Sequence, residues 1–343
     1  MDLYPHGSGD KRLGDLAGKP IRPTEHHPLP SGESSRPNDD RDSEIFDEGR
    51  VRVLMVMSVP SSDRPTLRRA RQVTPCRTLG AMRILITGAA RAIGAATAAE
   101  LIRSGHEVVT TARDVTLLDQ LDVSQRLALD VTDEESIRSA LSRAGELDAI
   151  VNNAALSGKG PLEDFPLDRL TAMFDTNTLG PLRLVQQVAP AWRLRGSGVI
   201  VNVSSIQGRV STPLEGPYSA SKYALESLSE TLHYELGHFG IRTVIIEPGY
   251  IGTGMKAPEP HAGDPVYAGL WEQWDGTGAK VNGPQGRPGP ELVAVAIRRA
   301  IEDPTTPLRV PVGDDAAMVL GARSQLDDPS FEKAMRDVLG ITW

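Results

Sequence analysis

Residues 82–94 read MRILITGAARAIG, and this stretch decides the fold. It begins with Arg83-Ile-Leu-Ile-Thr87, a continuous apolar run of the kind expected for a strand buried on both faces. The turn Thr87-Gly-Ala-Ala-Arg-Ala-Ile-Gly94 follows, and an alanine-rich pattern predicts a helix over Ile93–Ser104, ended by Gly105. A glycine-containing turn that opens a helix can present backbone N–H groups to a pyrophosphate. Taken alone, the turn is equally typical of an ordinary strand-to-helix connection.

The pattern continues outward from this stretch as alternating strands and helices. Further strands are predicted at Glu107–Thr111, Arg126–Leu129, Asp148–Val151, Gly198–Val203 and Arg242–Ile246, with a last strand at the sheet edge over Arg309–Gly313. Helices are predicted to about Ala144 after the cap Asp130-Val-Thr-Asp133, over about Leu167–Leu194 and over Pro217–Phe239. This order predicts an α/β fold, a single-domain Rossmann-like, doubly wound parallel sheet with helices on both faces. Such sheets bind ligands at the carboxyl ends of their strands.

The first 81 residues differ in composition from the rest. They are polar, proline-punctuated and mixed in charge, with no regular apolar period. Because such a segment buries too little apolar surface to offset its ordering entropy, 1–81 is expected to be a disordered or dispensable extension. Val51–Val59 is the exception and could form a short strand. We therefore expect Met82 to be the functional start and 82–343 to be the folded domain; a regulatory tail is the alternative.

Composition excludes several classes of protein. A net charge of -8 and a pI of about 5.5 argue against a general nucleic-acid-binding surface, because phosphate binding needs a basic face. The single cysteine, Cys76, excludes a disulfide framework, and His233, His238 and His261 lack metal-ligand spacing, so no metal site is expected. No apolar run reaches the roughly 18 residues that span a bilayer, and the N-terminus lacks a secretory core. The sequence therefore predicts a soluble, cytoplasmic protein.

The end of the second predicted strand bears on the choice of cofactor. An NAD-specific site usually places a carboxylate here to accept from the ribose hydroxyls. This chain reads Thr111-Ala-Arg113 and has no acid until Asp114. The Arg113 guanidinium can instead grip a 2′-phosphate bidentately, and Arg91 in the glycine turn can add a second positive charge. NADP(H) is therefore favoured over NAD(H); two solvated arginines are the alternative.

Asn177, Ser205, Tyr218 and Lys222 form the candidate catalytic set. Tyr218 and Lys222 are four residues apart on a predicted helix and so share one face. An ammonium near a phenol favours the phenolate, so we expect the pKa of Tyr218 to fall from about 10 toward working pH. A general acid/base for an alcohol–carbonyl pair needs this, and Ser205, at a strand end, can bond the same substrate oxygen. An ordinary surface pair on a helix is the alternative.

The motifs TGAARAIG, Asp130-Val, NNAA, Asn177, Ser205, YSASK and PGYIGT follow one another over about 82–313. In this order the chain resembles the short-chain dehydrogenase/reductase family, in the branch with TGxxxGxG and YxxxK motifs. The resemblance implies an NADP(H)-dependent oxidoreductase that transfers hydride between the nicotinamide and a ketone, aldehyde or secondary alcohol, with Tyr218 as general acid/base. It also implies a homodimer or homotetramer. An NADP(H)-binding sensor or scaffold without turnover and an NAD-linked alcohol dehydrogenase are the alternatives.

The resemblance also implies roles for individual residues. Gly88 and Gly94 would form the phosphate loop, Asp130 would bond the adenine amine beside Val131, and Lys222 would bind the nicotinamide ribose as well as tune Tyr218. Asn177 would bend its helix and hold a water of a proton relay. The other expected cofactor-binding residues are Arg91, Ile93, Arg113, Asn152, Ala154, Pro248, Gly249, Ile251 and Thr253. Ala92 and Ala155 depart from the family pattern by replacing glycines, and Ala92 puts cofactor affinity in doubt.

The stretch from about 252 to 290 is rich in glycine and proline and carries Tyr267, Leu270, Trp271 and Trp274. Long irregular segments in compact domains are commonly binding loops. The family has its substrate lid here, so the resemblance implies a substrate loop and a fairly apolar small-molecule substrate. Simple packing of the aromatic residues is the alternative.

Overall fold

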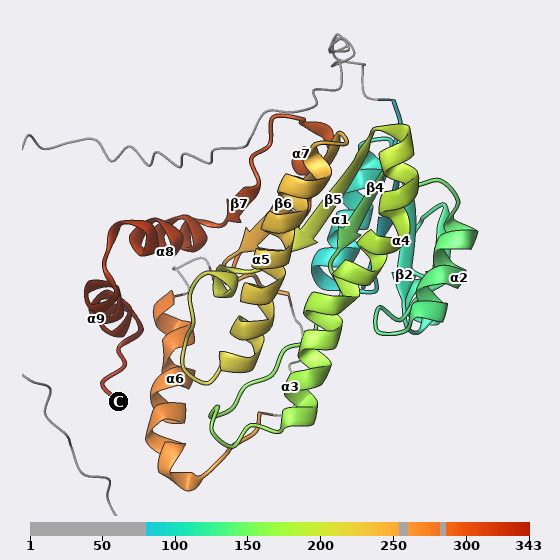
Figure 1. Cartoon of the computed structure of the whole chain (residues 1–343). Helices are drawn as coiled ribbons and strands as arrows, with labels where there is room; N and C mark the ends of the chain where they lie inside the picture. Colours follow the sequence, from blue (N-terminus) through green and yellow to red (C-terminus); the bar gives the residue numbers. More distant parts are fainter. Residues whose placement is uncertain (1–79, 254–259, 282–285) are drawn as a thin grey trace, which may run out of the picture. The chain divides into compact units, whose positions relative to one another are not determined.

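The computed structural model describes residues 80–253, 260–281 and 286–343 of the chain. These residues form a seven-stranded, fully parallel sheet with the strand order β3-β2-β1-β4-β5-β6-β7 (Figure 1). The strands are β1 (Arg83–Ile86), β2 (Glu107–Ala112), β3 (Gln125–Ala128), β4 (Ala149–Asn152), β5 (Gly198–Val203), β6 (Ile241–Pro248) and β7 (Arg309–Val312). The strand order reverses between β1 and β4, and ligands of doubly wound sheets bind at this switch point.

Helices cover both faces of the sheet (Figure 1). On one face lie α1 (Ala92–Arg103) and α7 (Glu291–Glu302), and on the other lie α2 (Glu134–Ala144), α4 (Gly180–Arg195) and α5 (Gly216–Gly237). The remaining α-helices of the described ranges are α3 (Leu167–Phe174), α6 (Ala268–Val281), α8 (Asp314–Gln325) and α9 (Asp328–Leu339). The fold is the doubly wound, Rossmann-like α/β sheet that the sequence predicts.

The two faces explain why the strands read as continuous apolar runs. Ile84 and Ile86 of β1 pack in the cluster beneath α1 and α7, whereas Leu85 packs in the cluster beneath α2 and α4. All three side chains are completely buried. Because successive side chains of a strand point to opposite faces, a strand covered on both sides needs apolar residues at every position.

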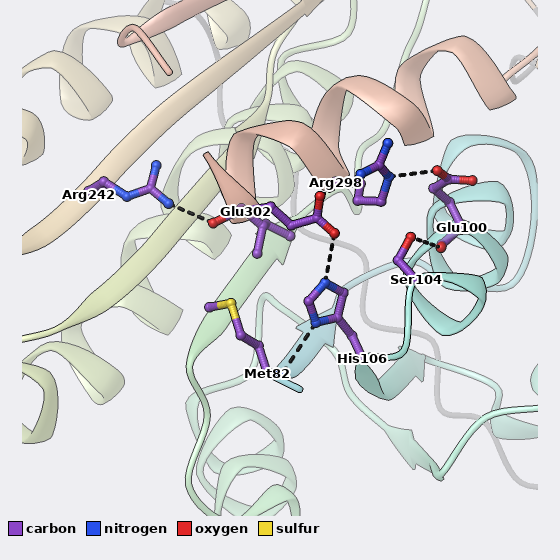
Figure 2. Close-up of polar contacts among 8 residues, drawn as sticks. Met82, Glu100, Ser104, His106, Arg242, Arg298 and Glu302 are labelled. Atoms are coloured by element: carbon purple, nitrogen blue, oxygen red, sulfur yellow. Dashed lines mark hydrogen bonds and ion pairs between the residues drawn. The ribbon is translucent and has the colours of Figure 1, made fainter. Parts of the chain in front are cut away.

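Polar contacts fasten α1 and α7 to the amino-terminal end of the sheet (Figure 2). His106 Nδ1 accepts a hydrogen bond from the Met82 backbone at 3.2 Å, so its ring hydrogen lies on Nε2, 3.2 Å from Glu302 Oε1. Arg298 Nε of α7 donates to Glu100 Oε1 of α1 at 2.8 Å. The chain is therefore tied to both helices from Met82 onward, one residue before β1 begins.

The structure differs from the predicted elements in two places. The helix predicted over about Leu167–Leu194 is divided by a π-helical turn, Asp175–Leu179, which separates α3 from α4. The stretch 252–290, expected to be irregular, contains the 14-residue helix α6. Its Leu270 and Trp274 pack with Leu214, Leu339 and Ile341, and this burial stabilises a helix that the local composition disfavours.

The other predicted strands and helices are present apart from small differences at their ends, and β7 lies at the sheet edge as expected. Helices α7, α8 and α9 were not predicted. The predicted extension 1–81 lies outside the described residues except for its last two. Val51–Val59 and Cys76 also lie outside them.

Candidate functional site

A cavity of about 730 Å³ opens at the carboxyl ends of strands β1 to β6. Segments that follow each of these strands line it, as expected for the switch point of a doubly wound sheet. The predicted residues among its lining are Gly88, Arg91, Ile93, Arg113, Asp130, Val131, Ala154, Ser205, Tyr218, Lys222, Pro248, Gly249, Ile251 and Thr253. Gly94, Asn152 and Asn177 are outside this lining. The tertiary structure thus gathers most of the predicted site into one crevice.

The turn after β1 is packed so closely that side chains are excluded from it. Gly88 has a φ of +65°, and a Cβ added there would lie 2.9 Å from Ala154 Cα. A Cβ added at Gly94 would lie 2.4 Å from the Gly88 carbonyl oxygen and 2.7 Å from Asn153 Nδ2. Real Cβ atoms do not approach other atoms this closely. The turn therefore forms a cradle of bare backbone at the start of α1, as phosphate binding requires.

Ala92 is the exception in this turn. It has a φ of +52°, in the left-handed region that costs an L-residue with a Cβ about 1–2 kcal/mol. The residue that departs from the family pattern therefore keeps the backbone conformation that a glycine would favour. The alanine therefore strains the turn.

Asn153, which sequence reasoning did not select, holds this turn in place. Its Nδ2 donates to the carbonyl oxygens of Thr87 (2.9 Å) and Gly88 (3.0 Å). Asn152, which was selected, is buried beneath the crevice and donates to Asn202 Oδ1 at 2.7 Å. Asn152 ends the buried strand β4 and Asn153 follows it, and only the pleat of the chain decides which of them faces the turn. Their position at the strand end is the signal that could have included Asn153.

The rim near β2 carries two arginines and one acid. Arg91 and Arg113 line the cavity and are exposed, and within the described ranges neither guanidinium has an ion-pair partner. Asp114 is turned toward the backbone: its Oδ1 accepts from Thr116 N at 3.0 Å and from Thr116 Oγ1 at 2.6 Å. These bonds lower the pKa of Asp114 below its ordinary value. Its carboxylate caps a short 3₁₀ helix, while the two arginines give the rim a positive potential.

Asp130 lies after β3, and one of its carboxylate oxygens accepts hydrogen bonds from within the protein. Its Oδ1 accepts from Thr132 N at 2.9 Å and from Thr132 Oγ1 at 2.8 Å. This turn fixes the carboxylate at the cavity wall and leaves Oδ2 as an acceptor for a ligand N–H. The neighbouring Val131 is buried against Gly180 of α4.

Ser205, Tyr218 and Lys222 come together across the end of β5 and the first turns of α5. Ser205 follows β5 and lines the same cavity as Tyr218, and its Oγ accepts a hydrogen bond from Gln207 N at 3.2 Å. Lys222 lies one helix turn beyond Tyr218 and is only 2% exposed. Its Nζ donates to the Val203 carbonyl at 2.8 Å and lies 5.7 Å from the centre of the Tyr218 ring. A phenol, a hydroxyl and an amine therefore meet on one wall of the crevice.

The expected shift of the Tyr218 pKa is wrong for this structure. Burial raises the pKa of Tyr218 above its ordinary value, the Glu215 carboxylate raises it further, and the hydrogen bond with Ser205 lowers it. Burial also lowers the pKa of Lys222 to about 8. The physical reason is desolvation, since the buried phenolate loses hydration that an ammonium bound to Val203 does not replace. The sequence shows the pair but not how dry its surroundings are.

Glu215 is a second residue that sequence reasoning missed. It precedes α5, is 9% exposed, and pairs with Lys159 Nζ at 3.0 Å. It also accepts a hydrogen bond from Gln207 Nε2, and Gln207 Oε1 in turn accepts from Ser219 Oγ at 2.9 Å. The Glu215 carboxylate raises the pKa of Tyr218, so it favours the protonated phenol.

Asn177 lies in the π-helical turn between α3 and α4. Its Oδ1 accepts from Leu156 N at 2.7 Å, and its Nδ2 donates to Leu156 O at 2.8 Å and to Ser221 Oγ at 2.9 Å. The helix irregularity expected at Asn177 is present. The side chain fastens the loop that lines the cavity after β4 to helix α5, close to Lys222.

Two further sequence expectations concern metals and membranes. Among the described residues, no three His, Cys, Asp or Glu side chains lie close enough to hold a metal ion. Within the same part of the chain, no helix combines the length and apolar character needed to cross a bilayer.

Comparison with known proteins identifies the family. The family model for short chain dehydrogenase matches residues 82–263. An uncharacterized oxidoreductase of Schizosaccharomyces pombe is 32% identical over 231 residues, which cover 66% of this chain and 93% of the relative. The uncharacterized oxidoreductase YusZ of Bacillus subtilis is 33% identical over 278 residues, covering 74% of this chain and 97% of YusZ.

Solved structures agree with this match. A short-chain dehydrogenase from Streptomyces avermitilis has 35% identity and a TM-score of 0.63, covering 75% of this chain and 99% of its own. One from Burkholderia cenocepacia, in complex with NADP, has 25% identity and a TM-score of 0.60, covering 76% and 97%. A 3-oxoacyl-[acyl-carrier protein] reductase from Brucella melitensis with bound NAD has 26% identity and a TM-score of 0.56, covering 67% and 88%. The chain therefore belongs to the short-chain dehydrogenase/reductase family, whose members are oxidoreductases that bind a nicotinamide cofactor.

Proposed function

We propose that this protein is an NADP(H)-dependent oxidoreductase that interconverts a ketone or aldehyde and the corresponding alcohol, with Tyr218 as the general acid/base. The observation that carries the proposal is that Ser205, Tyr218 and Lys222 line the same cavity as the glycine turn, with Tyr218 and Lys222 one helix turn apart on α5. A bound nicotinamide supplies or accepts the hydride. Tyr218 supplies or accepts the proton of the substrate oxygen, and Ser205 donates a hydrogen bond to that oxygen.

The residues around the cavity fit a dinucleotide with a 2′-phosphate. The bare backbone at Gly88 and Gly94 leaves room for a pyrophosphate at the start of α1. Arg91 and Arg113 are the groups that would hold the 2′-phosphate, because Asp114 is engaged by Thr116. Asp130 would accept from the adenine amine. Val131, Ile93, Ala154, Pro248, Gly249, Ile251 and Thr253 complete the proposed cofactor site, with Lys222 at the nicotinamide ribose and Asn152 supporting the site from beneath.

The proposed substrate is a small molecule that enters beside Tyr218. Trp271 and Trp274 do not line the described cavity, and Trp274 packs with Leu270 against the C-terminal residues. This favours the packing alternative for the aromatic residues. We propose that 252–290 is a substrate loop whose two tryptophans do not contact the substrate. We further propose a homodimer or homotetramer, supported by the 92% exposed Leu194 of α4 and the 73% exposed Tyr234 of α5.

Tyr218→Phe tests the assignment of the acid/base. The variant should lose about 10²- to 10⁴-fold in turnover of carbonyl compounds with NADPH while keeping its NADPH affinity in a fluorescence titration. Tyr223→Phe is the matched control, since Tyr223 is on the same helix, is 41% exposed and is outside the cavity lining. Unchanged turnover in Tyr218→Phe would refute the role. A wild type that binds NADPH but transfers no hydride across a broad panel of carbonyls and alcohols would favour the sensor or scaffold alternative.

Arg113→Asp tests the cofactor assignment. The substitution puts a carboxylate in place of the guanidinium, so kcat/KM should fall for NADPH and rise for NADH. Arg103→Asp is the control, because Arg103 is an exposed arginine at the far end of α1. If the ratio of the two kcat/KM values does not change in Arg113→Asp, the assignment of Arg113 to the 2′-phosphate is wrong.

A further inference from the structure

A group of charged side chains lies beyond Lys222, starting one helix turn further along α5. It joins Glu226 and Glu230 of α5, Glu247 of β6, Arg309 of β7 and Arg209, which follows the 3₁₀ turn after Ser205. Arg309 Nε lies 2.9 Å from Glu226 Oε2, and Arg309 Nη2 lies 2.7 Å from Glu230 Oε2. Arg209 Nη1 lies 3.4 Å from Glu247 Oε1. We refer to these five residues as the α5–β7 charge cluster.

The position of Glu226 within this cluster is unusual for a carboxylate. It is 3% exposed, whereas Glu230, which shares its arginine, has a side chain that is 44% exposed. A Cβ added at Gly208 would lie 2.7 Å from Ser204 Oγ and 3.2 Å from Glu226 Oε1, so both side chains converge on this glycine. A buried charge is costly to keep unless it is paired. Arg309 meets that requirement, but the sheet edge alone does not explain why the carboxylate lies so deep.

The position of Lys222 explains why the Glu226 carboxylate is buried. Glu226 follows it by four residues on α5, so the two side chains leave the same face of the helix. Lys222 Nζ donates to the Val203 carbonyl, and no described carboxylate lies within 4.0 Å of it. Burial lowers the pKa of Lys222 to about 8, and the charge of Glu226 opposes this by raising it. Glu226 is the member of the α5–β7 charge cluster whose charge raises the pKa of Lys222.

We propose that Glu226 is a positioning residue for the Tyr218–Lys222 pair: its buried carboxylate is the counter-charge that keeps the Lys222 ammonium protonated inside the protein. The inference rests on the proposed function of that pair. Burial raises the pKa of Glu226, and Ser204 and Arg309 limit this rise. The ion pair with Arg309 at 2.9 Å favours the carboxylate form. Arg209 and Arg309 similarly oppose the rise in the pKa of Glu247. The cluster thus holds one carboxylate charged at a fixed place behind the amine.

The test is to follow the ionisation of Lys222 directly by NMR of isotope-labelled lysine Cε. The chain has seven lysines, so the Lys222 signal can be assigned by its loss in Lys222→Met. Glu226→Gln should move the midpoint of this titration toward acid by about one pH unit, because it removes the opposing charge. Glu230→Gln, the same substitution at the other carboxylate of Arg309, should leave the midpoint unchanged. An unchanged midpoint in folded Glu226→Gln would overturn the inference.

The reciprocal measurement decides the question if Glu226→Gln does not fold. Coupling between two titrating sites is the same in both directions, so Lys222→Met should raise the midpoint of the Glu226 carboxyl titration. That signal is assigned by its loss in Glu226→Asp. An unmoved Glu226 midpoint would overturn the inference. Both titrations are measured without substrate and do not depend on turnover. Absence of hydride transfer would therefore refute the proposed function, and the titrations would still test the role of Glu226.

Discussion

Gly94→Ala should damage the turn that follows β1, although alanine is the best helix former and Gly94 lies within helix α1. The added methyl would lie 2.4 Å from the Gly88 carbonyl oxygen, 2.7 Å from Asn153 Nδ2 and 2.9 Å from Ala89 Cα. Two of these atoms are backbone, and the third belongs to a side chain that holds the turn through two hydrogen bonds. The turn therefore cannot accept the methyl by moving a flexible side chain.

The cost follows from this geometry. Overpacking a rigid site costs about 1–3 kcal/mol, which lowers the melting temperature of a domain of this size by about 2–12 °C. The displaced turn should also weaken NADPH binding by tenfold or more, since each tenfold corresponds to about 1.4 kcal/mol. Thermal unfolding measures the first effect, and a fluorescence titration with NADPH measures the second.

Gly321→Ala provides the matched control. Gly321 also lies inside a helix, α8, and nothing lies within 4 Å of the position that its Cβ would take. The substitution should stabilise the protein by about 0.5–1 kcal/mol through helix propensity alone. If Gly94→Ala is as stable as the wild type and binds NADPH equally well, the reasoning from close backbone approach is refuted.

Three further predictions concern strain, pH and the extent of the folded domain. Ala92→Gly should raise the unfolding free energy by about 0.5–1 kcal/mol, because relief of the left-handed alanine (about 1–2 kcal/mol) exceeds the cost of the added entropy of glycine in the unfolded chain. Urea denaturation that shows no increase in the unfolding free energy would contradict this. Burial raises the pKa of Glu247 to about 7 from an ordinary 4.5, so between these pH values only the folded state holds the proton and wild-type stability falls as pH rises. The Glu247→Gln variant has no carboxyl group to titrate, so its unfolding free energy relative to that of the wild type should increase by on the order of 2 kcal/mol from pH 4.5 to pH 8. If the difference in unfolding free energy between variant and wild type does not change with pH, Glu247 does not titrate in this way. A chain of residues 82–343 should fold with the melting temperature and turnover of the full chain, since Met82, directly before β1, already bonds to His106 of the folded domain; loss of folding in that chain would rule out the dispensability of 1–81.

Part of this protein is determined by local sequence. The apolar run Arg83–Thr87 can only be a strand covered on both faces, because no amphipathic period remains in it, and the glycines after it mark the turn. The same logic places the other strands and predicts the parallel sheet. The order of the motifs along the chain predicts the family, because each motif falls at the carboxyl end of its expected strand or on its expected helix.

Other features were decided by tertiary structure. A periodic pattern does not register the extra residue of a π-helical turn, so the apolar period did not show the break at Asp175–Leu179, and only the family resemblance implied a bend at Asn177. Helix α6 forms because Leu270 and Trp274 are buried against the C-terminal residues, and its own composition predicts a loop. Sequence position could not choose between Asn152 and Asn153, because the pleat of β4 makes that choice. The sequence also placed Tyr218 beside Lys222 without revealing that both are desolvated, with Glu215 near one and Glu226 near the other. Burial and through-space charge depend on segments far apart in the chain, and for this reason the direction of a pKa shift at such a site follows from the folded structure alone.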